Sequence, residues 1–352
     1  MRLSANTTLP VLIIYTGGTI GMQTGPQGLT PGGDFATRMQ CALATLPAGK
    51  RQLLPDVDVI SYSPLIDSSA TTPLDWQTLA DDIRARHADY AGVVVVHGTD
   101  TLSWTASSLA FQLRELERPI IVTGAMHPLE TPGSDALDNL YGALRFAMEP
   151  APAGVAVYFA GRLLHGARAT KQHASANDAF ISPNAPPLGE CLNGPLARKP
   201  LAPAVKEVLP TDHTPADYRR VAQGEVIRIA LWPGMAAWQL DAWLNDSRVK
   251  GALLQLWGAG NMADDPALID VLKQANDQGK LIAAVSQCPH GSVDMSAYAA
   301  AQGLVQAGVL SGADMTPEAA YTKLVHLLAL PLDNATRRAA FMTSLAGERS
   351  DG

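Results

Sequence analysis

Short apolar runs alternate with longer amphipathic segments along the first half of the chain. The runs within residues 93–96 and 120–122 are apolar at every position, so both faces of these strands are expected to be buried, as in a parallel sheet. The apolar runs that predict strands are Leu9–Tyr15, Val57–Tyr62, Gly92–Val96, Pro119–Thr123 and Val155–Phe159.

Helices are expected between these strands. Thr72 is a favourable N-cap residue and Pro73 suits the first helical position, so a helix is predicted over Pro73–His87. A second helix is predicted over Thr101–Leu116, where leucine and alanine recur at helical spacing. Strands that alternate with helices indicate a doubly wound, mostly parallel α/β sheet.

A proline-rich segment between Ser182 and Asp217 interrupts this alternation and predicts a linker with some extended structure. The sequence therefore predicts a larger N-terminal α/β domain over residues 1–190, a linker over 191–221 and a smaller C-terminal α/β domain over 222–352. The elements expected in the smaller domain are strands at Val226–Leu231, Ala252–Leu256 and Leu281–Val285 and a helix that Thr316-Pro317-Glu318 opens and Leu330 ends.

Composition agrees with two globular domains and excludes several classes of protein. The 352 residues are 47% hydrophobic and 17% charged, which is enough apolar material for two cores. A net charge of −7 without a Lys/Arg run disfavours binding to nucleic acid or to anionic membranes. The apolar run Val11–Tyr15 is too short for a signal peptide or a membrane span. Three widely spaced cysteines predict reduced thiols and a cytoplasmic location.

Turns rich in glycine and hydroxyl groups follow four of the predicted strands. Ligands of open parallel sheets bind beyond the carboxyl ends of the strands, so these turns are expected at one binding edge. The first, second and third of these turns also have a structural interpretation, as a tight turn, an Asx turn and a helix cap respectively. The first turn fits neither a P-loop nor a dinucleotide-binding motif. The turns are Thr16-Gly17-Gly18-Thr19-Ile20-Gly21, Asp67-Ser68-Ser69, His97-Gly98-Thr99-Asp100-Thr101 and Thr123-Gly124-Ala125.

Taken together, the first and third turns resemble the two signatures of the bacterial-type L-asparaginase/glutaminase family. The spacing is most similar to the cytoplasmic type I branch, and the resemblance covers essentially the whole chain. Further matching segments, in family order, are Ser134-Asp135 with Asn139, Arg168-Ala169-Thr170-Lys171, Gly258-Ala259-Gly260-Asn261 and Gly312-Ala313-Asp314-Met315-Thr316.

The resemblance implies a reaction and its catalytic residues. Thr16 is the implied nucleophile, which attacks the side-chain amide of L-asparagine and forms a β-aspartyl acyl-enzyme while ammonia leaves. Thr99, Asp100 and Lys171 resemble the family's second catalytic group, with Lys171 as the base that a threonine hydroxyl needs. Without the resemblance, Lys171 is an ordinary solvated lysine.

The resemblance also implies the substrate contacts and the partners. Asp67 and Ser68 would bind the α-carboxylate and α-ammonium groups, and Asp100 would pair with the α-ammonium. Gly98 and Ala125 would line the substrate, with backbone N–H groups near Thr99 and Ala125 as oxyanion donors. No metal or organic cofactor is implied. The expected assembly is a homotetramer of intimate dimers with its sites near the dimer interface.

Two positions depart from the family pattern. Leu29 stands where many members place a tyrosine, on a Gly/Pro-rich segment, Met22–Gly33, that is either a lid or a plain surface loop. Tyr298 is the candidate replacement for that tyrosine. Gln255 stands where an arginine is expected in the second asparagine site of some cytoplasmic members, so weak or absent cooperativity is predicted.

Other functions remain as alternatives. A mixed glutaminase-asparaginase differs by one methylene in the substrate, a difference of about 1–3 kcal/mol in a pocket. The amidase subunit of a tRNA-dependent amidotransferase shares the catalytic module but is disfavoured by the acidic charge. A catalytically weak asparagine sensor would bind without releasing ammonia. A metal site at Cys288 and His290 is disfavoured, since no second ligand pair lies at zinc spacing.

Overall fold

The computed structural model describes residues 9–25, 28–149, 154–191, 196–198, 216–295 and 299–350. The chain divides into two compact units. The larger unit comprises residues 1–71, 78–182 and 186–201, and the smaller unit comprises 72–77, 183–185 and 202–352.

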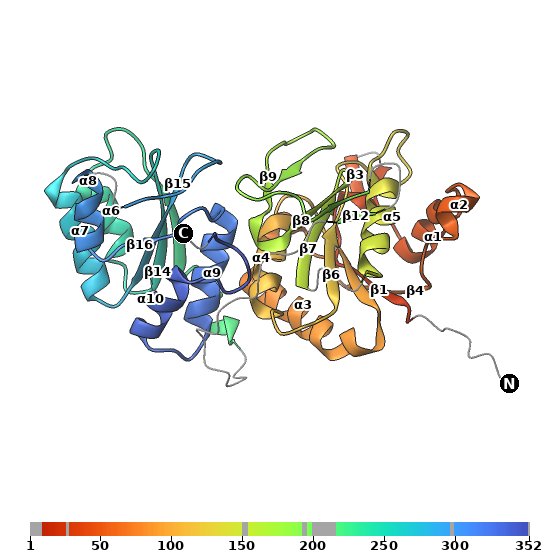
Figure 1. Cartoon of the computed structure of the whole chain (residues 1–352), viewed down its shortest axis with the longest axis horizontal. Helices are drawn as coiled ribbons and strands as arrows, with labels where there is room; N and C mark the ends of the chain where they lie inside the picture. Colours follow the sequence, from red (N-terminus) through yellow and green to blue (C-terminus); the bar gives the residue numbers. More distant parts are fainter. Residues whose placement is uncertain are drawn as a thin grey trace. The chain divides into compact units, whose positions relative to one another are not determined.

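An eight-stranded sheet forms the centre of the larger unit, in the order β12-β11-β8-β7-β6-β5-β1-β4 (Figure 1). The strands from β4 to β7 pair in parallel, and β8, β11 and β12 continue the sheet with antiparallel pairs. The predicted mostly parallel sheet is therefore confirmed. The strands are β1 (Val11–Tyr15), β4 (Val57–Ser61), β5 (Gly92–Val96), β6 (Pro119–Thr123), β7 (Gly154–Phe159), β8 (Arg162–His165), β11 (Gly189–Glu190) and β12 (Ala197–Arg198).

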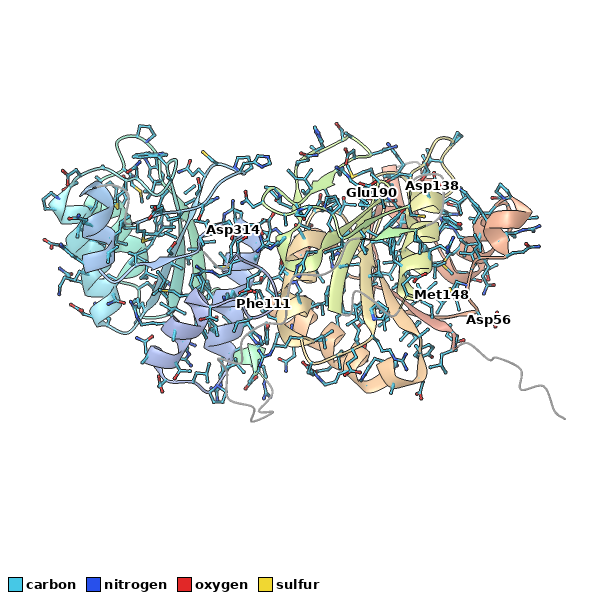
Figure 2. All side chains as sticks on the ribbon, viewed as in Figure 1. Asp56, Phe111, Asp138, Met148, Glu190 and Asp314 are labelled. Atoms are coloured by element: carbon cyan, nitrogen blue, oxygen red, sulfur yellow. The ribbon has the colours of Figure 1, made fainter. Side chains whose placement is uncertain are left out.

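Helices cover both faces of this sheet, as the unbroken apolar strands predicted. α1 (Phe35–Ala44) and α5 (Ala136–Ala147) share one core cluster with Val11 and Ile13 of β1. On α4 (Leu102–Gln112), which contacts β6 and β7, ten of the eleven side chains are buried, Phe111 among them (Figure 2). The predicted helix over Thr101–Leu116 is thus shorter at both ends. The other predicted helix is α3 (Pro73–Arg86), and α2 (Ala48–Arg51) is a single additional turn.

The segment predicted as a lid or a surface loop contains a two-stranded antiparallel hairpin. Its strands are β2 (Met22–Gly25) and β3 (Gly28–Pro31), and all of β3 is exposed. Because the hairpin buries almost no side chains, the sequence shows no apolar alternation that would have indicated strands. Gly28 has φ +103°, a conformation that glycine adopts without strain at the turn.

Three further short strands were not predicted individually from the sequence. β9 (Thr170–Lys171) and β10 (Phe180–Ile181) form a separate two-stranded pair. β12 lies inside the segment predicted as the linker and pairs with β11 at the sheet edge, in agreement with the expected extended structure. Within that segment, residues 192–195 and 199–215 lie outside the described residues, and Tyr218–Val221 forms a short 3-10 helix.

The smaller unit contains a four-stranded parallel sheet in the order β13-β14-β15-β16, which confirms the smaller α/β domain. The Thr316 hydroxyl caps α9 and Pro317 begins it, as predicted. No helix in the described part of the chain has the length and hydropathy that crossing a membrane requires. The elements are β13 (Val226–Ala230), β14 (Gly251–Leu256), β15 (Leu281–Ser286), β16 (Leu310–Ser311), α6 (Ala237–Leu244), α7 (Pro266–Asp277), α8 (Ala299–Gln306), α9 (Pro317–Ala329) and α10 (Asn334–Met342).

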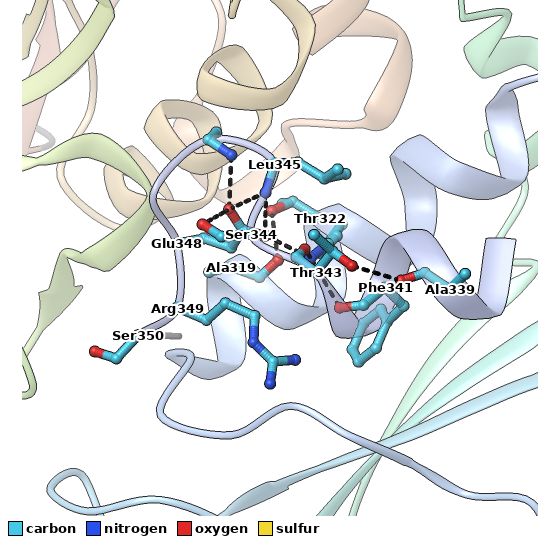
Figure 3. A network of polar contacts seen from close by, with 12 residues as sticks. Ala319, Thr322, Ala339, Phe341, Thr343, Ser344, Leu345, Glu348, Arg349 and Ser350 are labelled. Carbon is cyan, nitrogen blue, oxygen red and sulfur yellow. Dashed lines mark hydrogen bonds and ion pairs between the residues drawn. The ribbon is translucent and has the colours of Figure 1, made fainter. Parts of the chain in front are cut away.

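A fully buried ion pair fixes the C-terminal segment of the smaller unit. Lys323 on α9 and Glu348 are each 0% exposed and are in direct contact. Glu348 also accepts a hydrogen bond from the backbone N–H of Leu345 at 3.0 Å (Figure 3). A second backbone N–H, that of Ala346, donates to it at 2.7 Å. Burial disfavours the carboxylate, but Lys323 and these N–H groups outweigh that effect and hold the pKa of Glu348 below its ordinary value.

This pair predicts the effect of Glu348→Gln. The substitution leaves the Lys323 ammonium buried without its counter-charge, so unfolding free energy should fall by about 3–5 kcal/mol at pH 7. Because the folded-state pKa of Glu348 is lowered, the contribution is present above the pKa of an unfolded glutamate, about 4.3, and is lost as pH falls below it. Urea unfolding at several pH values checks both effects.

Asp277→Asn is the matched control. Lys273 and Asp277 also form an ion pair, at 2.8 Å, but the two side chains are 58% and 60% exposed. Removing that charge should change stability by less than about 1 kcal/mol. Equal losses in the two variants would contradict the role assigned to the buried pair.

Candidate active site

The site lies where the strand order of the large sheet reverses. β1 is flanked by β4 on one side and by β5 on the other, so the chain passes from β4 back across β1 to reach β5. Open α/β sheets bind ligands in the crevice at the carboxyl ends of the strands at this point. Thr16 directly follows β1, and His97 directly follows β5.

The first glycine-rich turn is fixed to the end of β5. Thr16 is 1% exposed, and its backbone N–H and its hydroxyl both donate to the Val96 carbonyl, at 3.0 and 3.1 Å. Gly18 has φ +97°, and a Cβ on it would lie 2.5 Å from the Cα of Gly98. Only glycine permits this approach, so the turn that begins at Thr16 packs directly against the turn His97–Thr101, which carries the second family motif.

Lys171 joins the second motif from a distant part of the chain. Its Nζ donates to the hydroxyl of Thr99 and to the carboxylate of Asp100, both at 2.9 Å. The Lys171 side chain is 18% exposed and the Asp100 side chain 67% exposed. The pairing of Lys171 with Phe180 in the β9–β10 ladder fixes the lysine backbone. The structure thus brings Thr99, Asp100 and Lys171 into one hydrogen-bonded group with an accessible carboxylate.

Asp67 and Ser68 lie beside the same motif. The side chain of Ser68 is buried, and a Cβ on Gly98 would lie 2.4 Å from its Oγ. The Thr101 hydroxyl donates to the Ser68 carbonyl at 2.7 Å. Asp67 accepts from the Ser69 N–H at 2.9 Å, which is the Asx turn that the sequence left as an alternative. Ser68 therefore contacts the Gly98 backbone, while Asp67 is exposed at the edge of this group.

The loop after β6 is positioned from the start of α5. Ala125 is 1% exposed. The Asp135 carboxylate accepts from the Met126 N–H at 2.9 Å, and the Asn139 amide donates to the Gly124 carbonyl at 3.0 Å. These bonds hold the backbone on both sides of Ala125, so its N–H has a fixed direction.

The sequence singled out three further positions. Tyr298 is outside the described residues. Leu29, which has no hydroxyl to offer, lies on β3 opposite Thr24 and is 48% exposed. Gln255 lies on β14 of the smaller unit, is 7% exposed and accepts from Arg228 at 2.8 Å.

Sequence reasoning missed Arg38 and Glu130, which form an ion pair next to the first turn. No local pattern marks Arg38, because its partners are distant in the sequence. A search of the described residues for three or more His, Cys, Asp or Glu side chains arranged to hold a metal ion finds none.

Comparison with known proteins identifies the family. Residues 10–199 match the model described as "Asparaginase, N-terminal", and residues 225–341 match "Glutaminase/Asparaginase C-terminal domain". The chain belongs to the asparaginase/glutaminase family.

The similarity to individual relatives covers nearly the whole chain. The chain is 40% identical to L-asparaginase 1 of Escherichia coli K12, over 96% of this chain and 97% of that protein. It is 34% identical to the 60 kDa lysophospholipase of Mus musculus, over 96% of this chain but only 62% of that protein. The crystal structure of L-asparaginase I from Vibrio cholerae superposes with a TM-score of 0.80, at 34% identity, over 98% of this chain and all of that one.

The contact between Gly18 and Gly98 predicts that alanine has opposite effects on stability at Gly18 and at Gly49. Gly18→Ala places a Cβ at positive φ and against Gly98, so it should lower unfolding free energy by about 2 kcal/mol or more. Gly49 on α2 has open space around the corresponding Cβ position. Gly49→Ala should therefore be neutral or stabilising, by up to about 1 kcal/mol. Urea unfolding of the two variants checks the prediction, and similar stabilities would contradict the close packing at Gly18.

Proposed function

We propose that this asparaginase-family chain hydrolyses the side-chain amide of L-asparagine to L-aspartate and ammonia. The observation that carries the proposal is the hydrogen-bonded group of Lys171, Thr99 and Asp100 beside the turn of Thr16. Full-length similarity to L-asparaginase 1 supports the same reaction. Amide hydrolysis needs a nucleophile, a base and donors for the oxyanion, and residues suited to each role lie at the carboxyl ends of β1, β5 and β6.

In the proposed reaction, the hydroxyl oxygen of Thr16 attacks the amide carbon. The backbone N–H groups at Thr99 and Ala125 donate to the oxyanion as it develops. The C–N bond then breaks, and the proton lost by the threonine hydroxyl is passed to the leaving nitrogen, which departs as ammonia. Water hydrolyses the resulting ester, releases L-aspartate and restores the Thr16 hydroxyl.

Lys171 serves the reaction through Thr99. The hydroxyl of Thr16 hydrogen bonds to Val96, whereas Lys171 hydrogen bonds to Thr99. We assign Lys171 and Thr99 to the transfer of protons to and from the reacting centre. Asp100 keeps Lys171 in place, and its exposed carboxylate is available to the α-ammonium of the substrate. Asp67 and Ser68, next to Gly98, complete the binding of the α-amino acid groups.

The proposal extends to assembly and location. A homotetramer built from intimate dimers, which the family resemblance implies, is the proposed assembly, and its mass can be measured by light scattering. A reducing, cytoplasmic location suits the cysteines Cys41, Cys191 and Cys288, which are unpaired thiols.

Ammonia release from L-asparagine and, separately, from L-glutamine tests the reaction. Thr16→Ala should lower kcat for asparagine by about 10³-fold or more, because the nucleophile is lost. Thr99→Ala and Lys171→Met should each lower kcat by about 10²- to 10⁴-fold. Since Thr99 and Lys171 act as one unit, the double variant should be little worse than either single variant.

Lys273→Met is the control for these variants, because it removes a lysine from an exposed Lys–Asp pair with nearly the same N–O distance. It should leave kcat unchanged. Full activity in Thr16→Ala would refute the assigned nucleophile. Equal turnover of glutamine would make the protein a mixed glutaminase-asparaginase, and asparagine binding without ammonia would make it a sensor.

The saturation curve for asparagine is a separate prediction. Gln255 lacks the charge of the arginine expected at its position, so a carboxylate ligand there is bound less strongly. Initial rates should therefore follow a hyperbola with a Hill coefficient near one. A clearly sigmoidal curve would contradict this prediction.

A further inference from the structure

Two backbone segments and the side chain of Arg38 meet at the base of the β2–β3 hairpin. The Gly21 carbonyl accepts from the Gly32 N–H at 3.0 Å and from Nη1 of Arg38 at 2.8 Å. Nη2 of Arg38 donates to the Met22 carbonyl at 3.3 Å. Gly21 ends the short 3-10 helix (Thr19–Gly21) that continues the turn of Thr16. Arg38, from α1, therefore binds the chain where that turn becomes the hairpin.

The same guanidinium binds the loop that follows β6. Its Nε and Nη2 donate to the two carboxylate oxygens of Glu130, a bidentate pair with Nη2–Oε2 of 2.6 Å. A neighbouring backbone bond, from the Leu129 N–H to the Ile20 carbonyl at 3.1 Å, joins the same two segments. Glu130 lies in the loop that begins with Gly124 and Ala125. Arg38 thus joins the Thr16 turn to the Ala125 loop.

Local packing restricts the Arg38 guanidinium to one position. The Arg38 side chain is 14% exposed, and a Cβ on Gly32 would lie 2.2 Å from its Nη1. The ring of Tyr15, the residue before Thr16, stacks on Phe35 at the start of α1, with centroids 3.9 Å apart. This stacking fixes α1 relative to the end of β1, so the position of Arg38 is set relative to Thr16. The Glu130 hydrogen bond raises the pKa of Arg38, and Arg38 lowers the pKa of Glu130.

We propose that Arg38 is a positioning residue for the reaction, which sets the base of the hairpin and the spacing between the Thr16 turn and the Ala125 loop. The inference rests on the proposed function, because it assigns the nucleophile to the first segment and an oxyanion donor to the second. Arg38 acts on neither the substrate nor the reacting atoms. Its contribution is geometric, and small displacements of reacting groups have large effects on rate.

The test compares Arg38→Met with Arg84→Met. Arg84 is a close match, because it also pairs with a glutamate, Glu115, and donates to a backbone carbonyl, that of Gln112. Arg38→Met should lower kcat/KM for asparagine by about 10- to 100-fold, mainly through kcat. Arg84→Met should leave both constants unchanged. Arg38→Lys keeps the charge but loses the bidentate geometry, so its loss should be intermediate.

Two further measurements separate positioning from a general loss of stability. Millimolar guanidinium should restore part of the activity of Arg38→Ala and none of the activity of Lys171→Met. Amide hydrogen exchange over residues 19–33 should be faster in Arg38→Met than in the wild type and unchanged in Arg84→Met.

The outcomes distinguish this inference from the proposed function. Unchanged kcat/KM in Arg38→Met, or a loss that Arg84→Met shares, would overturn the positioning role. If the wild type releases no ammonia, the proposed function fails. In that case the exchange data test only whether Arg38 holds the base of the hairpin. Unchanged exchange in Arg38→Met would reject that link.

Discussion

The architecture of the site depends on the pairing of β1 with β5 at the point where the strand order reverses. The parallel register ends with Tyr15 opposite Val96, and the Val96 carbonyl then accepts both the N–H and the hydroxyl of Thr16. This one carbonyl holds the proposed nucleophile at the end of its strand. Because the pairing continues into the loops, the Gly17-Gly18 turn meets Gly98, and the residues on either side of that contact become the site. The sheet determines which loops are neighbours, and glycine determines how close they come.

Much of this arrangement was predictable because the strands of the central sheet are buried on both faces. Strands such as Gly92–Val96 have apolar residues at every position, and the structure gives the bounds expected from that pattern. The two glycine-rich motifs were also predictable, since each follows such a strand. Their meeting at one edge followed from the rule for parallel sheets, without knowledge of the strand order.

Other parts had no signal in the sequence. The β2–β3 hairpin is exposed, so its strands have no apolar periodicity, and its glycines and proline instead suggested a loop. The two-residue strand that carries Lys171 is too short to form a pattern. The pair of Arg38 and Glu130 joins positions far apart in sequence, and its effect appears only when the fold brings them together. Short, exposed and long-range features escape a prediction that depends on burial and on local periodicity.

Two lysine–carboxylate pairs show how burial decides what such a pair does. Around Lys323, Glu348 and the backbone carbonyls of Phe341 and Thr343 accept the ammonium hydrogen bonds, and both side chains are fully buried. Removing the charge of either partner would leave the other charge buried and unpaired, so the pair is held in one ionised state. Lys171 instead shares its bonds between a hydroxyl and the exposed carboxylate of Asp100. Water and substrate can reach that carboxylate, which fits the proton-transfer role proposed for the group. An ammonium and a carboxylate therefore hold the C-terminal segment in one unit and belong to the proposed proton-transfer group in the other.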